Sequence, residues 1–199
     1  KLNLGCGLAV TPGWLNIDGS FNMFLSKMPI FIIRIFYKMS GASRYYSFER
    51  YSGILKNNQF MLYDLSFGLP FKTQTVQYIF TSHFLEHLEN YQAITLLNDC
   101  YRVLKSAGKI RISIPDLEFA IKLYPKDKEK MLKNYFFIDK SEGYHAQHKY
   151  MYDYEMMHRL LTQIGFKNIV RCSYQNGNVP DIEQLDNRPE DSLFIEAEK

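Results

Sequence analysis

Apolar and polar residues alternate in several short runs along the chain, and longer stretches with helical spacing separate these runs. The first run contains Leu2 and Leu4 and stops at Gly5 and Gly7, as a strand does when it ends in a tight turn. Further runs typical of strands cover residues 14–18, 59–64, 76–80, 109–114, 166–174 and 192–197. Because strands separated by helices usually pair in parallel through right-handed crossovers, this pattern predicts an α/β fold.

Helical spacing of apolar residues predicts three helices in the second half of the chain. They cover residues 85–104, 117–124 and 154–164. We expect Lys105 in the last turn of the first helix with Gly108 just beyond it, and we expect the charged residues 125–133 to continue the second helix on the surface. Asp153 is placed to cap the third helix, and Gly165 is placed to end it.

The last two strand-like runs are joined by a long polar loop, residues 175–191, in which no helix is expected. Two neighbouring strands that are joined without a crossover helix pair antiparallel. The chain is therefore predicted to close with an antiparallel hairpin.

An insertion rich in aromatic residues, 20–60, interrupts the alternation of strands and helices. Its first half, 21–39, is almost wholly apolar and is predicted to form a helix with three cations along one stripe. These cations are Lys27, Arg34 and Lys38. They argue against a membrane-spanning segment. The helix is expected either to cover a substrate cleft as a lid or to form a peripheral membrane contact or a dimer interface.

Length and composition describe a globular chain. The 199 residues, 46% hydrophobic and 23% charged, are enough for one domain with a full core, so we expect a single domain over 1–199 that carries the insertion. The net charge of +3 comes without a dense basic patch, since acids interleave with the lysines between 122 and 133. A nucleic-acid partner is therefore not expected.

The cysteines and the first residues of the chain bear on the cellular compartment of the protein. Cys6, Cys100 and Cys172 are odd in number and form no Cys-x-x-Cys pair, which excludes a disulfide scaffold and a cysteine zinc site and fits the reducing cytoplasm. No signal peptide is visible. The sequence starts inside a strand and without an initiator methionine, so we expect a native segment before Lys1.

The glycine turn and the next strand favour a ligand of the nucleotide type. Glycine lacks a Cβ, so the backbone at Gly5 and Gly7 can leave its amides open to a polar or anionic group. Asp18 ends the second strand, where its carboxylate can accept both hydroxyls of a ribose. A dinucleotide fingerprint requires a third glycine where Val10 stands, and its acid comes about 20 positions further on, so NAD is disfavoured.

Taken together, the motifs resemble the class I S-adenosylmethionine-dependent methyltransferases, in particular the small enzymes of type 11. The resemblance is carried by Leu4-Gly5-Cys6-Gly7, Asp18, Asp64-Leu65, residues 82–88 (SHFLEHL) and residues 101–105 (YRVLK) before Gly108. It spans residues 1–19 and 60–199. It implies a Rossmann-like three-layer sandwich with a seven-stranded, mostly parallel sheet in the order 3-2-1-4-5-7-6 and an antiparallel strand 7.

The resemblance also implies S-adenosyl-L-methionine as the cofactor, bound across the carboxyl ends of strands one to four. The residues expected to contact it are Gly5, Cys6, Gly7, Asp18, Gly19, Asp64, Leu65, Ser82 and His83. By the family pattern, the glycine turn meets the methionine and ribose parts, and the first aspartate holds the ribose hydroxyls. The second aspartate and the amide after it read the adenine edge, and the last two residues flank the methionine. The family's first helix is reduced or lost here, since ten residues separate Gly7 from Asp18.

Methyl transfer requires alignment of the acceptor with the methyl group and, for a hydroxyl acceptor, a base such as histidine. The candidate catalytic residues are His83, Glu86, His87 and His148. The first three follow strand four, beside the expected methyl group, although Glu86 and His87 can equally support the start of the helix. His145 and His148 precede the last helix, where they form a candidate acceptor-binding loop; alternatively, His148 is a hydrogen-bonded structural residue.

The activity is expected to be transfer of a methyl group to an O or N atom of a small-molecule or glycan-type acceptor. Two alternatives remain. One is a catalytically silent methyltransferase-like domain that only binds a partner. The other is a metal-dependent hydrolase, because His83-x-x-Glu86-His87 has the spacing of an inverted zinc-protease motif.

Overall fold

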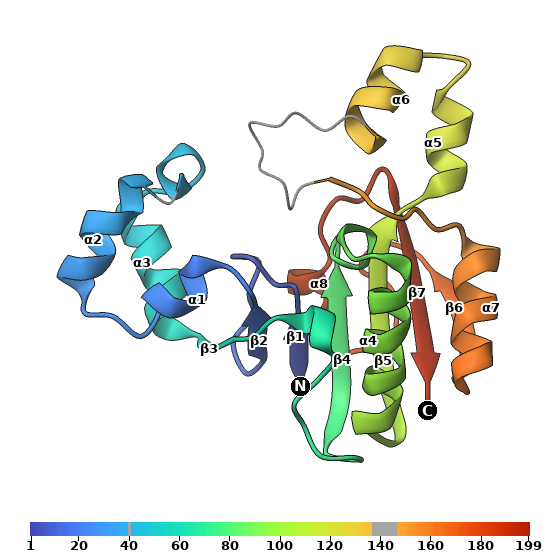
Figure 1. Cartoon of the computed structure of the whole chain (residues 1–199), viewed down its shortest axis with the longest axis horizontal. Helices are drawn as coiled ribbons and strands as arrows, with labels where there is room; N and C mark the ends of the chain where they lie inside the picture. Colours follow the sequence, from blue (N-terminus) through green and yellow to red (C-terminus); the bar gives the residue numbers. More distant parts are fainter. Residues whose placement is uncertain (40, 137–146) are drawn as a thin grey trace.

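The computed structural model describes residues 1–39, 41–136 and 147–199. Seven strands form one sheet (Figure 1). They are β1 (Leu2–Leu4), β2 (Leu15–Asp18), β3 (Gln59–Leu62), β4 (Val76–Ser82), β5 (Leu104–Pro115), β6 (Lys167–Cys172) and β7 (Ser192–Glu198). Their order in the sheet is β3-β2-β1-β4-β5-β7-β6. The pairs from β3 to β5 are parallel, and β7 is antiparallel to β5 and β6, which confirms the expected sheet.

The parallel register brings the carboxyl ends of β1, β2, β3 and β4 to one edge of the sheet. Leu4, at the end of β1, is paired with Ile17 of β2 and with Thr81 of β4. Asp18 is paired with Leu62 at the end of β3. Residues that directly follow these strands therefore lie along the same edge, which is the upper edge in Figure 1.

The described part of the chain contains eight α-helices. They are α1 (Phe21–Leu25), α2 (Ile30–Met39), α3 (Phe48–Asn57), α4 (Asn90–Val103), α5 (Leu117–Leu123), α6 (Lys128–Tyr135), α7 (Tyr154–Ile164) and α8 (Ile182–Leu185). Asp153 caps α7 by accepting a hydrogen bond from the Met156 N–H, and Gly165 ends this helix in the left-handed region with φ of 114°. Both ends of α7 are as predicted.

Four sequence predictions about helices were wrong. The stretch 21–39 is two helices, because the chain turns before Pro29, whose ring and missing N–H disfavour a helix interior. The helix expected over 85–104 begins at Asn90 and ends at Val103, while Leu85–His87 forms a separate 3₁₀ turn.

The end of this helix and the later loops also differ. Lys105 lies in β5 and not in the last turn of α4. The expected continuation over 125–133 is instead a separate helix, α6. Asp127 caps the start of this helix by accepting a hydrogen bond from the Lys130 N–H. The loop 175–191 contains α8, whose apolar residues pack on the sheet.

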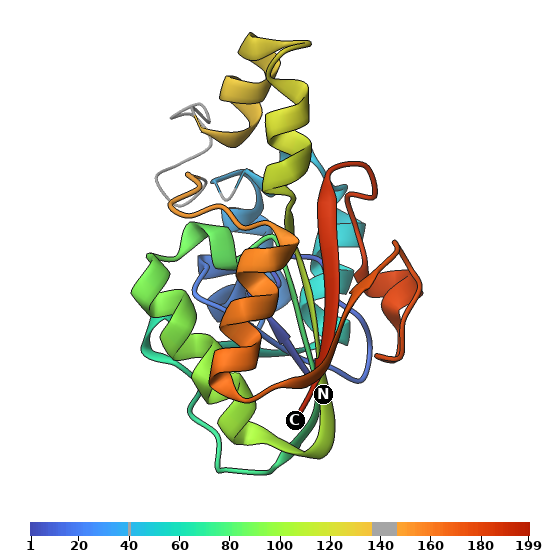
Figure 2. The ribbon, with the colours of Figure 1, turned by 90° about the vertical axis from the view of Figure 1, so that its right-hand side faces the viewer.

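The main core lies between the sheet and the helices α4 and α7, which stand side by side on one face (Figure 2). The side chains of β5 alternate: Ile110, Ile112 and Ile114 belong to this core, and all three are fully buried. The residues between them, such as Arg111, point to the opposite face and are buried by a different part of the chain.

That opposite face has no helix between β1 and β2 to cover it. Instead, the segment between β6 and β7 folds across it, and Ile182 and Leu185 pack against Trp14 and Phe80. The guanidinium of Arg111 is held there by carboxylates and backbone carbonyls of residues 173–196. The predicted loss of the family's first helix is thus compensated by a segment from the other end of the chain.

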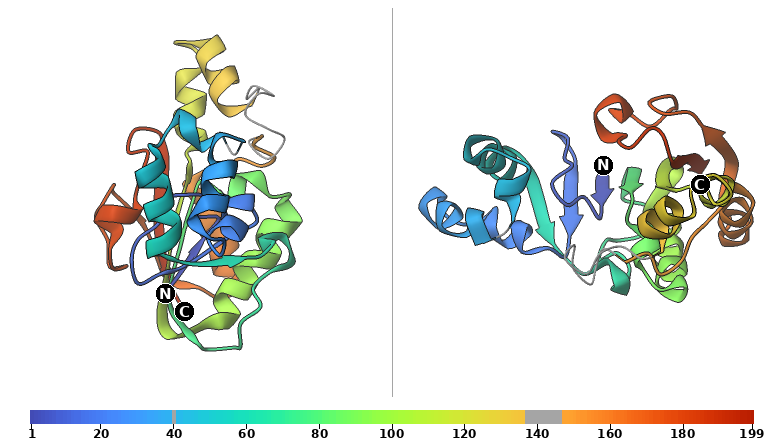
Figure 3. Two further views of the ribbon diagram at one scale, coloured as in Figure 1. Left: turned by 90° about the vertical axis from the view of Figure 1, so that its left-hand side faces the viewer. Right: turned by 90° about the horizontal axis from the view of Figure 1, so that it is seen from above.

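The insertion forms its own small apolar cluster beside β3, at the end of the sheet opposite β6 (Figure 3). Its buried members are Leu25, Ile33, Ala42, Tyr51 and Leu55. In the described part of the chain, no helix has the length and apolar content needed to cross a membrane. Whether the insertion acts as a lid stays a prediction.

Candidate functional site

The glycine turn after β1 is tightly packed at Gly5 and open at Gly7. Gly5 has φ of +64°, and its N–H donates a hydrogen bond to the Ile17 carbonyl at 2.9 Å. A Cβ at this position would lie 2.1 Å from Cγ of Phe84, so no side chain fits without moving that ring. Gly7, with φ of +51°, has open space around its Cα, which leaves room for a ligand beside the turn.

Asp18 is joined directly to this turn. One carboxylate oxygen accepts a hydrogen bond from the Gly7 N–H at 2.8 Å, and the other accepts one from the Ser20 N–H at 2.7 Å. Gly19 lies between Asp18 and Ser20 in the sequence. Each carboxylate oxygen keeps a second lone pair, so Asp18 can also accept hydrogen bonds from a ligand.

Cys6, inside the turn, is buried, and this burial raises the pKa of its thiol. A thiol with a raised pKa stays protonated at neutral pH and is a poor nucleophile. Cys6 therefore offers a ligand its backbone and its small apolar side chain, without covalent chemistry.

Asp64 and Leu65 follow β3 at the same edge of the sheet. The Tyr63 N–H donates a hydrogen bond to the Asp18 carbonyl at 3.2 Å, which ties this strand end to Asp18. Asp64 caps a short 3₁₀ turn by accepting a hydrogen bond from the Ser66 N–H at 2.9 Å, and Leu65 is buried. The two aspartates thus lie on neighbouring strand ends, as the sequence predicted.

Ser82 ends β4 and His83 follows it, and both contact residues 187–192, which lead into β7. The Ser82 hydroxyl donates a hydrogen bond to the Asn187 side chain at 3.2 Å. Because the Ser192 hydroxyl donates its hydrogen to the Arg188 carbonyl at 2.6 Å, His83 Nε2, which lies 2.8 Å from that hydroxyl, must be the donor between them. The other nitrogen of His83, Nδ1, then accepts from the Arg188 guanidinium at 3.4 Å.

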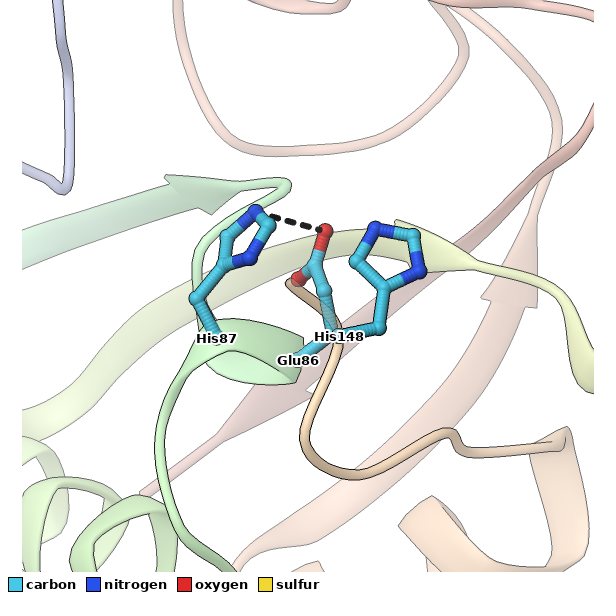
Figure 4. Close-up of side chains that lie close together, drawn as sticks. All are labelled: Glu86, His87 and His148. Carbon is cyan, nitrogen blue, oxygen red and sulfur yellow. Dashed lines mark ion pairs between the residues drawn. The ribbon is translucent and has the colours of Figure 1, made fainter. Parts of the chain in front are cut away.

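The side chains of Glu86, His87 and His148 form a cluster near the carboxyl edge of the sheet (Figure 4). One ligating atom from each residue lies within 4.8 Å of the other two. The Glu86 side chain is 1% exposed, and its Oε1 lies 3.8 Å from Nε2 of His87 and 3.5 Å from Nδ1 of His83. Neither contact is a hydrogen bond, and neither carboxylate oxygen has a hydrogen-bond partner among the described residues.

Backbone hydrogen bonds bring His148 to Glu86 across a long stretch of sequence. The Lys149 and Tyr150 N–H groups donate to the Glu86 carbonyl at 2.7 Å and 3.3 Å. The rings of His87 and His148 then lie 5.1 Å apart between centroids. Burial lowers the pKa of His148, so its imidazole is neutral at pH 7.

A cavity of about 350 Å³ is connected to the histidines through two of its lining residues. Its lining includes Phe119, Tyr135, Arg188 and Asp191. The Tyr135 carbonyl accepts a hydrogen bond from His148 Nδ1 at 3.1 Å, and Arg188 contacts His83, so two lining residues also hold the histidines. None of Glu86, His87 and His148 lines the cavity, so Tyr135 and Arg188 lie between its contents and the histidines.

Sequence reasoning singled out His83, Glu86, His87 and His148 but missed the residues that contact His83 and His148. Tyr135 lies just beyond the predicted surface helix, Arg188 lies in the predicted polar loop, and Ser192 begins a predicted strand. No local motif marks them, because each acts through a contact with a residue distant in sequence. His145 lies outside the described residues.

A scan against protein-family models finds no match, and no curated protein sequence matches the chain. Solved structures do match. A SAM-dependent methyltransferase from Archaeoglobus fulgidus superposes with a TM-score of 0.58 at 17% identity, over 100% of this chain and 85% of that one. A SAM-dependent methyltransferase from Thermotoga maritima gives 0.55 at 15% identity, over 100% and 81%. A protein from Pyrococcus horikoshii gives 0.54 at 18% identity, over 99% and 80%.

The mostly parallel sheet, with glycines and carboxylates at its carboxyl edge that can bind a ligand, defines an α/β protein of the Rossmann-like class. Within that class, the order β3-β2-β1-β4-β5-β7-β6 and the antiparallel β7 are shared with its structural neighbours. The chain has the fold of the class I SAM-dependent methyltransferases.

Proposed function

We propose that the chain is a class I methyltransferase that uses S-adenosyl-L-methionine and methylates an O or N atom of a small-molecule or glycan-type acceptor. The observation that carries the proposal is the hydrogen bond between the Gly7 N–H and Asp18 at the carboxyl edge of a sheet with this topology. It joins the open glycine turn to a carboxylate with free lone pairs. Adenosine requires this combination of a close backbone approach and an acceptor for two ribose hydroxyls.

The residues at the edge suit the parts of this cofactor. Gly5, Cys6 and Gly7 would face its methionine and ribose parts, and Asp18 with Gly19 would hold the ribose. A second set on the neighbouring strand ends completes the expected contacts: Asp64, Leu65, Ser82 and His83. When bound, the cofactor supplies a methyl group on a positively charged sulfur. The sulfur would be the leaving group and would keep the electron pair of the S–CH₃ bond, so these residues need only hold the donor in line with the acceptor.

For a hydroxyl acceptor, the proton must leave as the O–CH₃ bond forms. His87 is suited to receive it, because its Nδ1 lies 3.1 Å from the Gln147 carbonyl and must donate there, which leaves the lone pair on Nε2. Neutral His148 and the Glu86 carboxylate stand beside it and stabilise the positive charge. His83, whose ring contacts Ser192 and Arg188, would act as a positioning residue beside the cluster.

The cavity lined by Tyr135 and Arg188 supports the acceptor class. A volume of about 350 Å³ suits a small molecule or a sugar unit. Lys130 and Arg188 offer donors, and Glu190 and Asp191 offer acceptors, on the same lining. Such a mixture suits a neutral acceptor with several hydroxyl groups.

Calorimetric titration with S-adenosylhomocysteine tests the proposal. We expect micromolar binding to the full chain, weakened at least tenfold by Asp18→Ala and by Asp64→Ala, because each removes a hydrogen-bond acceptor for adenosine. Asp153→Ala is the matched control: it removes the cap of α7 and costs stability, but it should leave the affinity unchanged. Absence of binding would favour a silent domain or a hydrolase and would refute the methyltransferase assignment.

We further propose that α1 and α2 dock on an anionic membrane surface. Six of their large apolar side chains are exposed: Phe21, Phe24, Ile30, Phe31, Ile35 and Met39. Residues 19–48 also contain four cations, Lys27, Arg34, Lys38 and Arg44, and no acid. Exposed apolar groups among cations of one sign are typical of segments that lie in the headgroup region of anionic lipid.

Sedimentation with vesicles tests this docking. We expect binding to vesicles that contain phosphatidylglycerol, and about a 30-fold loss of affinity in the double variant Lys27→Gln/Lys38→Gln, since each cation near the surface contributes about 1 kcal/mol. The control is Lys126→Gln/Lys133→Gln, which removes the same charge from the other end of the molecule. Equal binding of both double variants would contradict the proposal, and so would a dimer in solution that buries the same side chains.

A further inference from the structure

The three side chains of the Glu86–His87–His148 cluster face one another with electron pairs and no hydrogen-bond donors. His87 Nδ1 and His148 Nδ1 each lie 3.1 Å from a backbone carbonyl, of Gln147 and Tyr135. A carbonyl oxygen only accepts hydrogen bonds, so both Nδ1 atoms carry hydrogen. In the neutral rings, both Nε2 atoms are then bare lone pairs.

The Glu86 carboxylate adds an anion to these two lone pairs. Its side chain is almost fully buried, and no described group donates a hydrogen bond to either oxygen. An isolated buried carboxylate is strongly disfavoured unless a cation or several donors compensate it. His83 does not supply a donor, because its hydrogen is used toward Ser192 and its other nitrogen accepts from Arg188. The cluster as a whole therefore requires a positive charge at its centre.

We propose that Glu86, His87 and His148 bind one divalent transition-metal ion of the zinc type. Two imidazoles and one carboxylate are a recognised ligand set for zinc and for other first-row metals. Histidine ligands of metals almost always donate their second ring N–H to a carbonyl or a carboxylate, and both histidines do so here. The metal would thus find its ligands already in the correct tautomer.

The distances allow the site to close with small side-chain movements. The three ligating atoms lie within 4.8 Å of one another. Bonds of about 2.0–2.2 Å would bring them to roughly 3–3.5 Å apart, a shift that rotation about side-chain bonds supplies. The backbone hydrogen bonds from Lys149 and Tyr150 to the Glu86 carbonyl already hold the two ligand segments together.

The site is open on one side. The His87 side chain is 24% exposed, and Tyr135, which orients His148, also lines the 350 Å³ cavity. Three protein ligands and an open position are typical of catalytic zinc, whereas structural zinc has four protein ligands. If the proposed methyl transfer is correct, a hydroxyl of the acceptor would take the open position and lose its proton there to solvent, in place of transfer to His87. The metal site itself does not depend on that reaction.

The test uses the untagged full chain, treated with a chelator that is then removed. Titration with Zn²⁺ is expected to show one site per chain, and Co²⁺ is expected to give visible absorption bands of low-symmetry coordination. Glu86→Gln and His148→Ala should each weaken binding by about 100-fold or more, since they remove a ligand. His158→Ala, an exposed histidine on α7, is the matched control and should bind like the wild type.

Thermal unfolding provides a second measurement that does not depend on catalysis. At a Zn²⁺ concentration about 100 times Kd, the melting temperature of the wild type should rise by about 5–10 °C. The Glu86→Gln variant, which keeps the side-chain shape, should show no rise. If Glu86→Gln or His148→Ala prevented folding, the melting curve of that variant without metal would show it.

Three results would overturn the proposal: no binding of Zn²⁺ or Co²⁺, equal binding in the ligand variants and the control, or binding of Mg²⁺ alone. S-adenosylhomocysteine titration of the same metal-free preparation separates this proposal from the methyltransferase assignment. Cofactor binding without metal binding refutes only the metal site. Metal binding without cofactor binding refutes only methyl transfer.

Discussion

At the scale of single residues, the strongest constraint falls on positions where backbone conformation and packing together allow only one residue type. Gly5 must be glycine for two reasons, its positive φ and the Phe84 ring that fills the place of a Cβ. The sequence indicated the turn from the two glycines alone. The contact with Phe84, almost 80 positions later, became evident only in the fold.

We predict that Gly5→Ala damages the site more than Gly7→Ala. Both positions have positive φ, which costs a residue with a Cβ about 1–2 kcal/mol, but only the new Cβ at Gly5 would overlap another side chain. Displacement of Phe84 should lower S-adenosylhomocysteine affinity more than tenfold. Calorimetry and melting curves on both variants check this, and equal losses would show that backbone strain alone matters.

At the scale of elements, a clamp from α4 holds the loop that carries Asp64. Asp99 accepts hydrogen bonds from the Leu69 N–H at 2.7 Å and from Arg102 Nε at 2.7 Å. Arg102 also donates to the Leu69 and Phe71 carbonyls at 2.9 Å and 2.7 Å. The loop after β3 is thus fixed by side chains of a helix and not by strand pairing.

The Asp99 clamp predicts a specific loss of stability in acid. Burial raises the pKa of Asp99, but the hydrogen bonds from Arg102 and from the Leu69 N–H outweigh it, and the net pKa lies below the ordinary value of 3.8. A lowered folded pKa means that the stabilisation is fully present above about pH 4 and is lost as the pH falls below it. Asp99→Asn should therefore be less stable than the wild type at pH 6, and the difference should be smaller at pH 3. Denaturant unfolding at both pH values measures this, and a pH-independent difference would contradict it.

At the scale of the whole molecule, the segment between β6 and β7 does the work of a missing helix. It crosses the sheet, buries Trp14, and supplies Asp186, which binds the fully buried Arg111 through two hydrogen bonds of 2.8 Å and 2.5 Å. Glu196 of β7 binds the same guanidinium at 3.1 Å. This ion cluster links the last part of the chain to the centre of the sheet.

Asp186→Ala is therefore expected to destabilise the protein strongly. Removal of one partner of a buried ion pair costs about 3–5 kcal/mol, which lowers the melting temperature by roughly 6–20 °C in a chain of this size. The control is Lys122→Gln, which removes an exposed pair with Glu118 and should change stability by less than about 0.5 kcal/mol. A small effect of Asp186→Ala would show that Glu196 alone compensates Arg111.

The strand order was implied only by the resemblance to the class I methyltransferases. The sequence alone determined which runs form strands, the antiparallel pairing at the end of the chain, and the residues that follow the strand ends. These depend on local alternation, on turn-forming glycines and on helix caps such as Asp153, which short stretches of chain specify by themselves. The break at Pro29 and the late start of α4 were missed, because apolar spacing continues across both boundaries. Tertiary structure alone decided the partners of Arg111 and the cover of the open face. It also decided the meeting of His148 with Glu86, because hydrogen bonds and burial between distant segments depend on how the whole chain closes.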